Sequence, residues 1–237
     1  MAEQKQDVMD KKTAMKEFAA IGQKQNFAYQ AKFFLNAFWK EHSKEAETIF
    51  EFTQQFVELN KKGSKGSVLD EFQAHRLLEK QGNVLTVVAM RKALKEIDVD
   101  TDNKMSLLEY CVWRYKVDIV EMMNRPQGVS KELEACEEKI QAIQADLKKV
   151  AKYKKKWDGK PAPESGPKKI IYDQDMMILT TAEKTLTQNM DFAQRKLNAA
   201  QNNKDLVAAG KTWWIKREIE EAKKYAAPKK GWRSNIV

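Results

Sequence analysis

Twelve residues from Asp98 to Glu109, DVDTDNKMSLLE, carry the most constraining pattern in the chain. Oxygen-bearing groups recur at loop positions one, three, five, seven, nine and twelve, which are Asp98, Asp100, Asp102, the backbone carbonyl of Lys104, Ser106 and Glu109. On a tightly turning loop these groups point inward, and the final glutamate supplies two oxygens at once. A hard cation such as Ca²⁺ requires this set of ligands. The spacing therefore predicts an EF-hand calcium loop.

Position six of this loop departs from the common pattern. Most such loops have glycine there because the backbone turns left-handed; here the residue is Asn103, which tolerates that conformation at roughly 1–2 kcal/mol. We expect weaker binding rather than none. The alternative is an acidic turn that matches by chance, and apolar stripes in the flanking segments argue against it. These stripes are Met90, Ala93, Leu94 and Ile97 before the loop, and Tyr110, Trp113 and Val117 after it.

A second loop is expected upstream, where KKGSKGS at residues 61–67 interrupts the helical pattern. If Gln73 stands at position twelve, this loop starts at Lys62, 36 residues before Asp98, which is about the repeat of paired EF-hands. Its ligand positions then hold Lys62, Ser64 and Gly66, so it should bind no calcium. We expect the degenerate loop at 62–73 to pair with the calcium loop at 98–109 within one lobe at about residues 45–120.

Composition predicts an all-α fold, because 237 residues include only 9 Gly and 5 Pro while helix-forming residues dominate. No apolar run reaches the roughly 18 residues that a membrane span requires, and MAEQKQDVMDKK lacks the core of a signal peptide. We therefore expect a soluble, intracellular protein. Cys111 and Cys136 lie in apolar stripes, where they act as small hydrophobes.

Catalytic signatures are absent from the sequence. It contains no HExxH pair, zinc-type cysteine spacing, glycine-rich phosphate loop or GxSxG elbow, and its two histidines, His42 and His75, are far apart. We expect a protein that is not an enzyme and that binds no metal other than calcium.

Two domains are predicted. Residues 1–128 form an N-terminal helical domain with the EF-hand pair, and its first 60 residues hold core aromatics: Phe18, Phe27, Tyr29, Phe33, Phe34, Phe38, Trp39, Phe50, Phe52 and Phe56. RPQG at 125–128 breaks the helical pattern. Residues 129–227 form a three-helix bundle, followed by a basic tail at 228–237. Residues 129–237 hold 23 Lys and Arg against 15 Asp and Glu, a net charge of +8 out of +9, so this half should seek an acidic surface.

The bundle is predicted from apolar residues that repeat three and four positions apart, as in a coiled coil. One seam comprises Leu133, Cys136, Ile140, Ile143, Leu147 and Val150, and the other comprises Met176, Leu179, Ala182, Leu186, Met190, Ala193, Leu197 and Ala200. The two long helices should pack antiparallel. A shorter third helix, TWWIKREIEEAKKY at 212–225, should complete the bundle.

Three segments together resemble the calcium-regulated actin-bundling protein family of amoeboid protists. They are FLNAFWKEHSKEAETIF at 34–50, ALKEIDVDTDNKMSLLEYCVWRYK at 93–116 and TWWIKREIEEAKKY at 212–225. The resemblance implies a lobe with one degenerate and one working EF-hand loop, a C-terminal helical bundle that binds filaments, and inhibition of bundling by calcium. The chain departs from the family in Asn103 and in shorter connections before the first loop and before the tryptophan pair.

Under this resemblance, basic residues of the C-terminal half are candidate filament contacts. They are Lys148, Lys149, Lys152, Lys154, Lys155, Lys156, Lys160, Lys168 and Lys169, with Trp213, Lys216 and Arg217 in the third helix. Solvated helix faces are the alternative explanation of the lysines. Adjacent residues on a helix point about 100° apart, so we expect Trp214 to be buried and Trp213 to remain partly exposed.

The leading functional hypothesis is a cytoplasmic, cytoskeletal protein that binds Ca²⁺ and cross-links actin filaments. The alternative is a structural calcium-binding component of a microtubule array or axoneme, because tubulin is also acidic. A nucleic-acid-binding protein fits the basicity but lacks any recognisable binding motif. A plain calcium sensor normally has two working loops in a lobe. The sequence leaves open whether cross-linking uses two sites on one chain or self-association.

Overall fold

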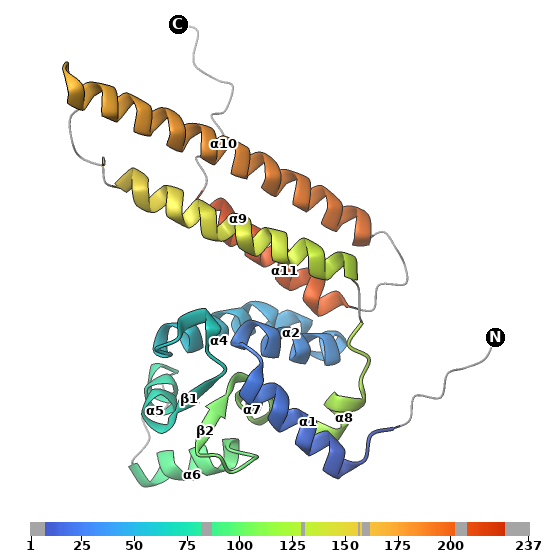
Figure 1. The fold of residues 1–237 in the computed structure, drawn as a ribbon. Coiled ribbons are helices and arrows are strands. Elements are labelled where there is room, and N and C mark those ends of the chain that lie inside the picture. The colour runs from blue at the N-terminus through green and yellow to red at the C-terminus, as the bar shows by residue number, and fades with distance from the viewer. Residues whose placement is uncertain are drawn as a thin grey trace, which may run out of the picture. The chain divides into compact units, whose positions relative to one another are not determined.

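The computed structural model describes residues 8–81, 87–128, 131–155, 157, 162–201 and 208–225. Two lysines of the predicted filament surface, Lys156 and Lys160, and the basic tail at 228–237 lie outside these residues. Within the described ranges the regular secondary structure is helical apart from two three-residue strands, so the all-α prediction is confirmed (Figure 1). None of the described helices is long and apolar enough to cross a bilayer.

The chain divides into two compact units. The first unit comprises residues 1–129 and 207–211, and the second comprises 130–206 and 212–237. The first contains α1 (Lys11–Lys24), α2 (Phe27–Ala37), α3 (Trp39–His42), η1 (Ser43–Glu45), α4 (Ala46–Leu59), η2 (Gly63–Lys65), β1 (Val68–Asp70), α5 (Glu71–Lys80), α6 (Val87–Ile97), β2 (Lys104–Ser106), α7 (Leu107–Tyr115) and α8 (Ile119–Asn124). The second contains α9 (Lys131–Lys155), α10 (Pro167–Gln201) and most of α11 (Ala209–Lys223).

Short polar side chains start the helices of the first unit. At five helix N-termini the residue before the helix accepts hydrogen bonds from the first backbone N–H groups, which otherwise lack partners. These residues are Asp10, Asn26, Asp70, Ser106 and Asp118, which precede α1, α2, α5, α7 and α8. In α5 and α7 the third helical residue returns the bond, which makes a capping box.

Aromatic side chains make up much of the core of the first unit. Phe27 packs edge-on against Phe56 with 5.2 Å between ring centroids, and Tyr110 of α7 packs against both Phe52 and Phe56. Seven of the ten predicted core aromatics are buried: Phe18, Phe27, Phe34, Phe38, Phe50, Phe52 and Phe56. Phe33 and Trp39 are half-buried. Tyr29 is 42% exposed, and its ring lies beside that of Phe33 near the surface of α2.

The two helix–loop–helix segments are joined by a two-stranded antiparallel sheet. Leu69 of β1 stands opposite Met105 of β2, and both side chains are buried. These residues are 36 positions apart, as are Lys62 and Asp98, the predicted first positions of the two loops. The sheet therefore joins position eight of one loop to position eight of the other, as the sequence pattern predicts. Each loop covers apolar surface that the other would leave in water.

In the second unit, α9 and α10 lie side by side as an antiparallel pair (Figure 1). Leu133, Ile140 and Leu147 of α9 are buried, as are Met190, Ala193 and Leu197 of α10. The predicted seam is therefore buried along most of α9 but only toward the end of α10. Nearer the start of α10, Met176, Leu179, Ala182 and Leu186 are only half-buried. The side chain of Ala200 lies outside the described residues.

The tryptophan pair lies on α11. Trp214 is 1% exposed and its indole N–H donates to the Glu218 carboxylate at 3.0 Å, whereas Trp213 is half-buried. The expected difference between the two tryptophans is confirmed, since adjacent helical residues point in different directions. The helix starts at Ala209, three residues earlier than predicted, and these first residues cluster with the first unit.

Candidate calcium site and basic surface

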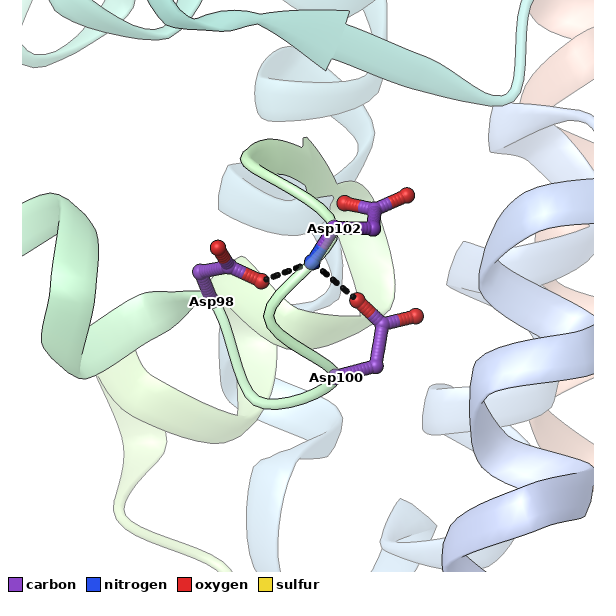
Figure 2. Close-up of side chains that lie close together, drawn as sticks. All are labelled: Asp98, Asp100 and Asp102. Carbon is purple, nitrogen blue, oxygen red and sulfur yellow. Dashed lines mark hydrogen bonds between the residues drawn. The ribbon is translucent and has the colours of Figure 1, made fainter.

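Three aspartates of the predicted calcium loop lie together (Figure 2). One carboxylate oxygen from each of Asp98, Asp100 and Asp102 lies within 4.8 Å of the others. The backbone N–H of Asp102 donates to Asp98 at 3.1 Å and to Asp100 at 3.2 Å. These hydrogen bonds hold the carboxylates around the turn. Three hard oxygen donors in so small a volume match the requirements of a divalent cation such as Ca²⁺.

Burial and the negative charge of neighbouring aspartates both act on Asp100. Partial burial raises the pKa of its carboxyl above the usual value, and the neighbouring Asp102 and Asp98 raise it further, while hydrogen bonds from Gln23 and Asp102 lower it. Lys104 places its ammonium 3.6 Å from the second oxygen of Asp102, which offsets part of this repulsion. A bound cation would remove the repulsion more effectively.

Two residues of the loop have left-handed backbone conformations. Asn103 has φ of 59°, as predicted from its place at position six, and its N–H donates to Asp98 at 3.0 Å. Thr101 at position four also has φ of 59°. A β-branched side chain is a rare occupant of this region, whereas asparagine tolerates it. Thr101 is therefore the more strained of the two, and no sequence pattern marks it.

We expect Thr101→Gly to stabilise the calcium-free first unit by about 1 kcal/mol, because glycine adopts positive φ without the Cβ clash. Native-state hydrogen exchange of buried α7 amides in chelator measures this free energy. Asn103→Gly is the matched control, with the same φ and a smaller expected gain. A lower opening free energy in Thr101→Gly would contradict this prediction. It would show that the threonine side chain stabilises the wild type by more than its backbone strain destabilises it.

Glu109 lies outside the aspartate cluster. Its side chain is 4% exposed, and it accepts hydrogen bonds from the Val99 N–H at 3.0 Å, the Ser106 N–H at 2.8 Å and the Ser106 hydroxyl at 2.8 Å. Burial raises the pKa of this carboxyl to about 7, although the hydrogen bonds from Ser106 and Val99 lower it. Ser106 in turn accepts from the Glu109 N–H at 3.1 Å. The structure thus uses positions nine and twelve as the capping box of α7.

The upstream loop has the same backbone arrangement without the acidic residues. Asp70 and Gln73, at its positions nine and twelve, form the capping box of α5. Lys62, Ser64 and Gly66 occupy the positions where the second loop has aspartates. The amide of Asn60 closes this loop by donating to the Val68 carbonyl at 2.7 Å. Among the described residues, only the Asp98–Asp102 group clusters acidic side chains in a way that suits a metal ion.

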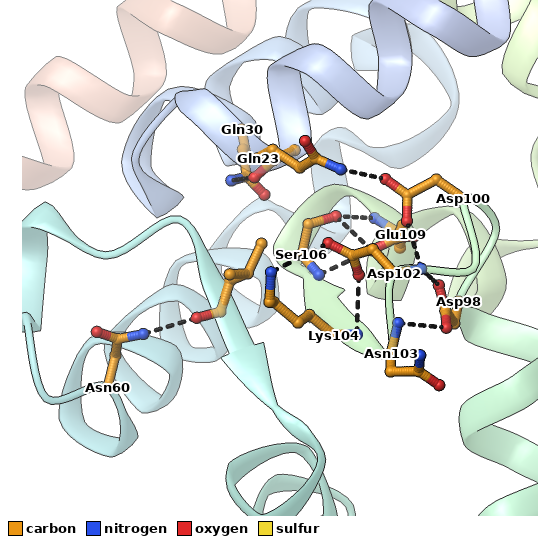
Figure 3. Close-up of polar contacts among 12 residues, drawn as sticks. Gln23, Gln30, Asn60, Asp98, Asp100, Asp102, Asn103, Lys104, Ser106 and Glu109 are labelled. Atoms are coloured by element: carbon orange, nitrogen blue, oxygen red, sulfur yellow. Dashed lines mark hydrogen bonds and ion pairs between the residues drawn. The ribbon is translucent and has the colours of Figure 1, made fainter.

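Two glutamines that the sequence analysis missed contact this lobe's loops (Figure 3). The side-chain amide of Gln23 in α1 donates to Asp100 at 3.0 Å. Gln30 in α2 is fully buried; it donates to the Ser67 carbonyl of the upstream loop at 2.8 Å and accepts from the Leu108 N–H at 3.0 Å. Neither residue lies near a recognisable motif, so the sequence held no signal for them.

The basic residues of the second unit are mostly at the surface. Lys148, Lys149, Lys152, Lys155 and Lys168 are exposed, and Lys154, Lys169, Lys216 and Arg217 are partly covered. Several have acidic neighbours on the helices: Lys149 pairs with Asp146 at 2.8 Å, Lys169 with Asp173 at 3.1 Å, and Arg217 with Glu221 at 2.6 Å. Lys154 binds Glu183, a buried carboxylate on α10. Lys154 therefore helps to hold α9 against α10.

The fold and the loop together define a class of protein. It is an all-α protein in which two helix–loop–helix segments, joined by a short sheet and one of them with an acidic cluster, are followed by a unit of long helices.

Comparison with known proteins supports the resemblance drawn from the three segments. No protein-family profile matches the chain. It is 25% identical over 270 aligned positions, 92% of this chain and 90% of the relative, to a calcium-regulated actin-bundling protein of Dictyostelium discoideum. Its fold matches the crystal structure of the 34 kDa F-actin bundling protein of that organism with a TM-score of 0.76, at 23% identity over 94% of this chain and 99% of the other. The resemblance to this family is confirmed.

Proposed function

We propose that this protein binds and cross-links actin filaments in the cytoplasm and that Ca²⁺ modulates the cross-linking. The observation that carries the proposal is the acidic cluster of Asp98, Asp100 and Asp102, placed in a chain that is similar along most of its length to a calcium-regulated actin-bundling protein. The proposed role of this protein is structural and regulatory rather than catalytic.

In the proposed calcium site, the three aspartates and the backbone carbonyl of Lys104 supply oxygen ligands on the loop, and Ser106 lies at the position that often acts through a water molecule. Glu109 completes the set with two oxygens. To do so it has to give up its hydrogen bonds to Val99 and Ser106 and turn toward the aspartates. Calcium binding therefore rearranges the start of α7, which makes this helix the first place where the ion has a structural effect.

In the proposed filament surface, lysines near the connection between α9 and α10 face the acidic filament. Exposed ammonium groups there attract it at long range, and screening by salt weakens that attraction once the Debye length falls below about 10 Å. Trp213, Lys216 and Arg217 of α11 are further candidates for contact. Because Lys154 is paired with a buried carboxylate, we assign it mainly to the fold.

Replacing Lys148, Lys152, Lys155 and Lys168 with glutamine should weaken co-sedimentation with F-actin about tenfold and flatten its dependence on salt, because each loses a long-range attraction. These lysines are exposed in the second unit. The matched control replaces Lys11, Lys12, Lys16 and Lys24, four exposed lysines of α1, and makes the same change in net charge. Equal losses in the two variants would indicate a general charge effect; an unchanged first variant would move the contact elsewhere.

Co-sedimentation with F-actin and with microtubules, each in calcium and in chelator, tests the proposal as a whole. We expect pelleting with actin and more bundling in chelator than in calcium. Microtubule binding without actin binding would favour the alternative of a structural component of a microtubule array. Bundling requires two filament contacts, which come either from one chain or from two associated chains. Light scattering of the same samples with and without actin reports whether the protein self-associates.

A further inference from the structure

Helix α2 carries two polar side chains that hold other segments of the first unit. Gln30 lies near its start and is fully buried, and Asn36 lies near its end and is half-buried. Each one makes hydrogen bonds to backbone groups far away in the sequence. The two residues have different targets: Gln30 holds the loops, whereas Asn36 holds the two chain segments that connect the units.

Gln30 joins three segments at the loop end of α2 (Figure 3). Its amide nitrogen, which carries two N–H donors, lies 2.9 Å from the Gly22 carbonyl oxygen, 2.7 Å from that of Gln25 and 2.8 Å from that of Ser67, so two of the three acceptors share one donor. Its carbonyl oxygen accepts from the N–H of Leu108, the residue before Glu109. The start of α7, which has to move when Glu109 reaches a cation, is thus fixed to α2 by a direct and fully buried hydrogen bond.

Asn36 joins the two connections at the other end of α2. Its amide donates to the Gln127 carbonyl at 3.2 Å, where the chain leaves the first unit, and its oxygen accepts from the Lys211 N–H at 2.7 Å, where the chain has returned in α11. All of these residues belong to the first unit. One side chain therefore holds both segments of the first unit that run into the second unit.

Two further contacts tighten this end of α2. Arg125, on the outgoing segment, donates to the Ala37 carbonyl at 2.8 Å and lies over the Phe38 ring, 4.3 Å from its centroid. Gly210, on the returning segment, comes so close that a Cβ there would lie 2.6 Å from the Leu35 backbone carbon and 2.7 Å from the Asn36 nitrogen. The returning segment thus has no room for even a methyl group. Such close packing transmits a displacement rather than absorbing it.

We propose that α2 is the element through which calcium in the loop regulates filament bundling, with Gln30 at its input and Asn36 at its output. This inference rests on the proposed function. The ion favours the arrangement in which Glu109 has turned toward the aspartates, and Leu108 moves with it. Gln30 passes that movement to α2, and Asn36 passes it to both connections. Regulation therefore requires contacts at both ends of the helix, including the end remote from the ion.

Asn36→Ala and Gly210→Ala test the output end from opposite sides, in the full-length chain. Asn60→Ala is the matched control, because Asn60 also makes two side-chain hydrogen bonds to the backbone of the first unit, but to Val68 and Lys62 instead of the connecting segments. Calorimetry gives calcium affinity, and low-speed sedimentation with F-actin gives bundling in calcium and in chelator. Effector coupling in proteins is typically about 5–150-fold. We expect both variants to keep a calcium affinity within about twofold of the wild type. The ratio of bundling in chelator to bundling in calcium should fall to about one in both variants, whereas Asn60→Ala should keep the ratio of the wild type.

Reciprocity supplies a second readout. If calcium weakens filament binding, filaments must weaken calcium binding by the same factor. We expect F-actin to lower the calcium affinity of the wild type and of Asn60→Ala, and to leave that of Asn36→Ala and Gly210→Ala unchanged. A general loss of stability in the first unit would give another result. It would change the calcium affinity measured without actin, and it would not selectively remove the effect of F-actin on that affinity.

The outcomes separate the inference from the function on which it rests. A wild type without calcium binding, or without actin bundling, would contradict the proposed function. A calcium-sensitive wild type with two equally sensitive variants would overturn the inference alone. Loss of calcium binding in both variants would also overturn it, because Asn36 and Gly210 would then maintain the fold of the loop instead of carrying its signal.

Discussion

Titration of calcium into the wild-type chain should give a stoichiometry near one, and Glu109→Gln should weaken binding about 100-fold, roughly 2.8 kcal/mol. The substitution removes the negative charge of Glu109, the proposed bidentate ligand. It also places a side-chain amide donor next to the N–H groups of Val99 and Ser106, which donate hydrogen bonds to the Glu109 carboxylate in the wild type. Isothermal titration calorimetry measures both the stoichiometry and the affinity.

Glu96→Gln is the matched control for this prediction. Glu96 is an exposed residue of α6, so the substitution makes the same charge change close to the loop without touching a proposed ligand. We expect its affinity to stay close to that of the wild type. Two sites of similar strength in the wild type would show that the loop at 62–73 also binds calcium. An unchanged affinity in Glu109→Gln would mean that Glu109 stays in its capping box when the ion is bound.

Gln30→Leu should destabilise the first unit by roughly 3 kcal/mol, because it removes the side-chain hydrogen bonds of a fully buried residue to four backbone groups, two of the bonds being buried and two part-buried. Leucine has a similar volume, so the loss reflects polar contacts rather than a cavity. Native-state hydrogen exchange of buried α4 and α7 amides measures the effect, and it isolates the first unit from the second.

Gln23→Leu is the comparison for Gln30→Leu. Gln23 is exposed and makes one described hydrogen bond, to Asp100, so we expect a change within about 0.5 kcal/mol. A loss of less than about 1 kcal/mol in Gln30→Leu would show that other groups or water replace its contacts. In that case α2 would not be tied to the loops firmly enough to carry a signal from them.

The two loops illustrate how one frame serves two purposes. Both have a strand residue facing its counterpart, Leu69 or Met105, and both end in a capping box at positions nine and twelve. Only the second has acidic residues at positions one, three and five. The first loop therefore contributes packing and strand pairing, while the second also contributes the acidic side chains that we propose as calcium ligands. In the proposed site a single cation then acts on the loop at 98–109, while the upstream loop packs against it without binding an ion.

Local patterns in the sequence determined the helical class, the acidic loop and the strand pairing of the hands. They could do so because a helical period, a ligand spacing and a 36-residue offset depend on residues close together or regularly repeated. The difference between Trp213 and Trp214 also followed from helix geometry alone. These features require no knowledge of which distant segments meet.

Only the tertiary structure decided which polar side chains serve the loop and the connections. Gln23 meets Asp100 across 77 positions, Gln30 meets Leu108 across 78, and Asn36 meets Lys211 across 175. The tertiary structure also places Glu109 in a capping box apart from the aspartates, and it pairs Lys154 with Glu183. Such contacts depend on how helices pack in three dimensions, and a glutamine or asparagine in a helix has the same local pattern whether it faces water or a buried backbone group.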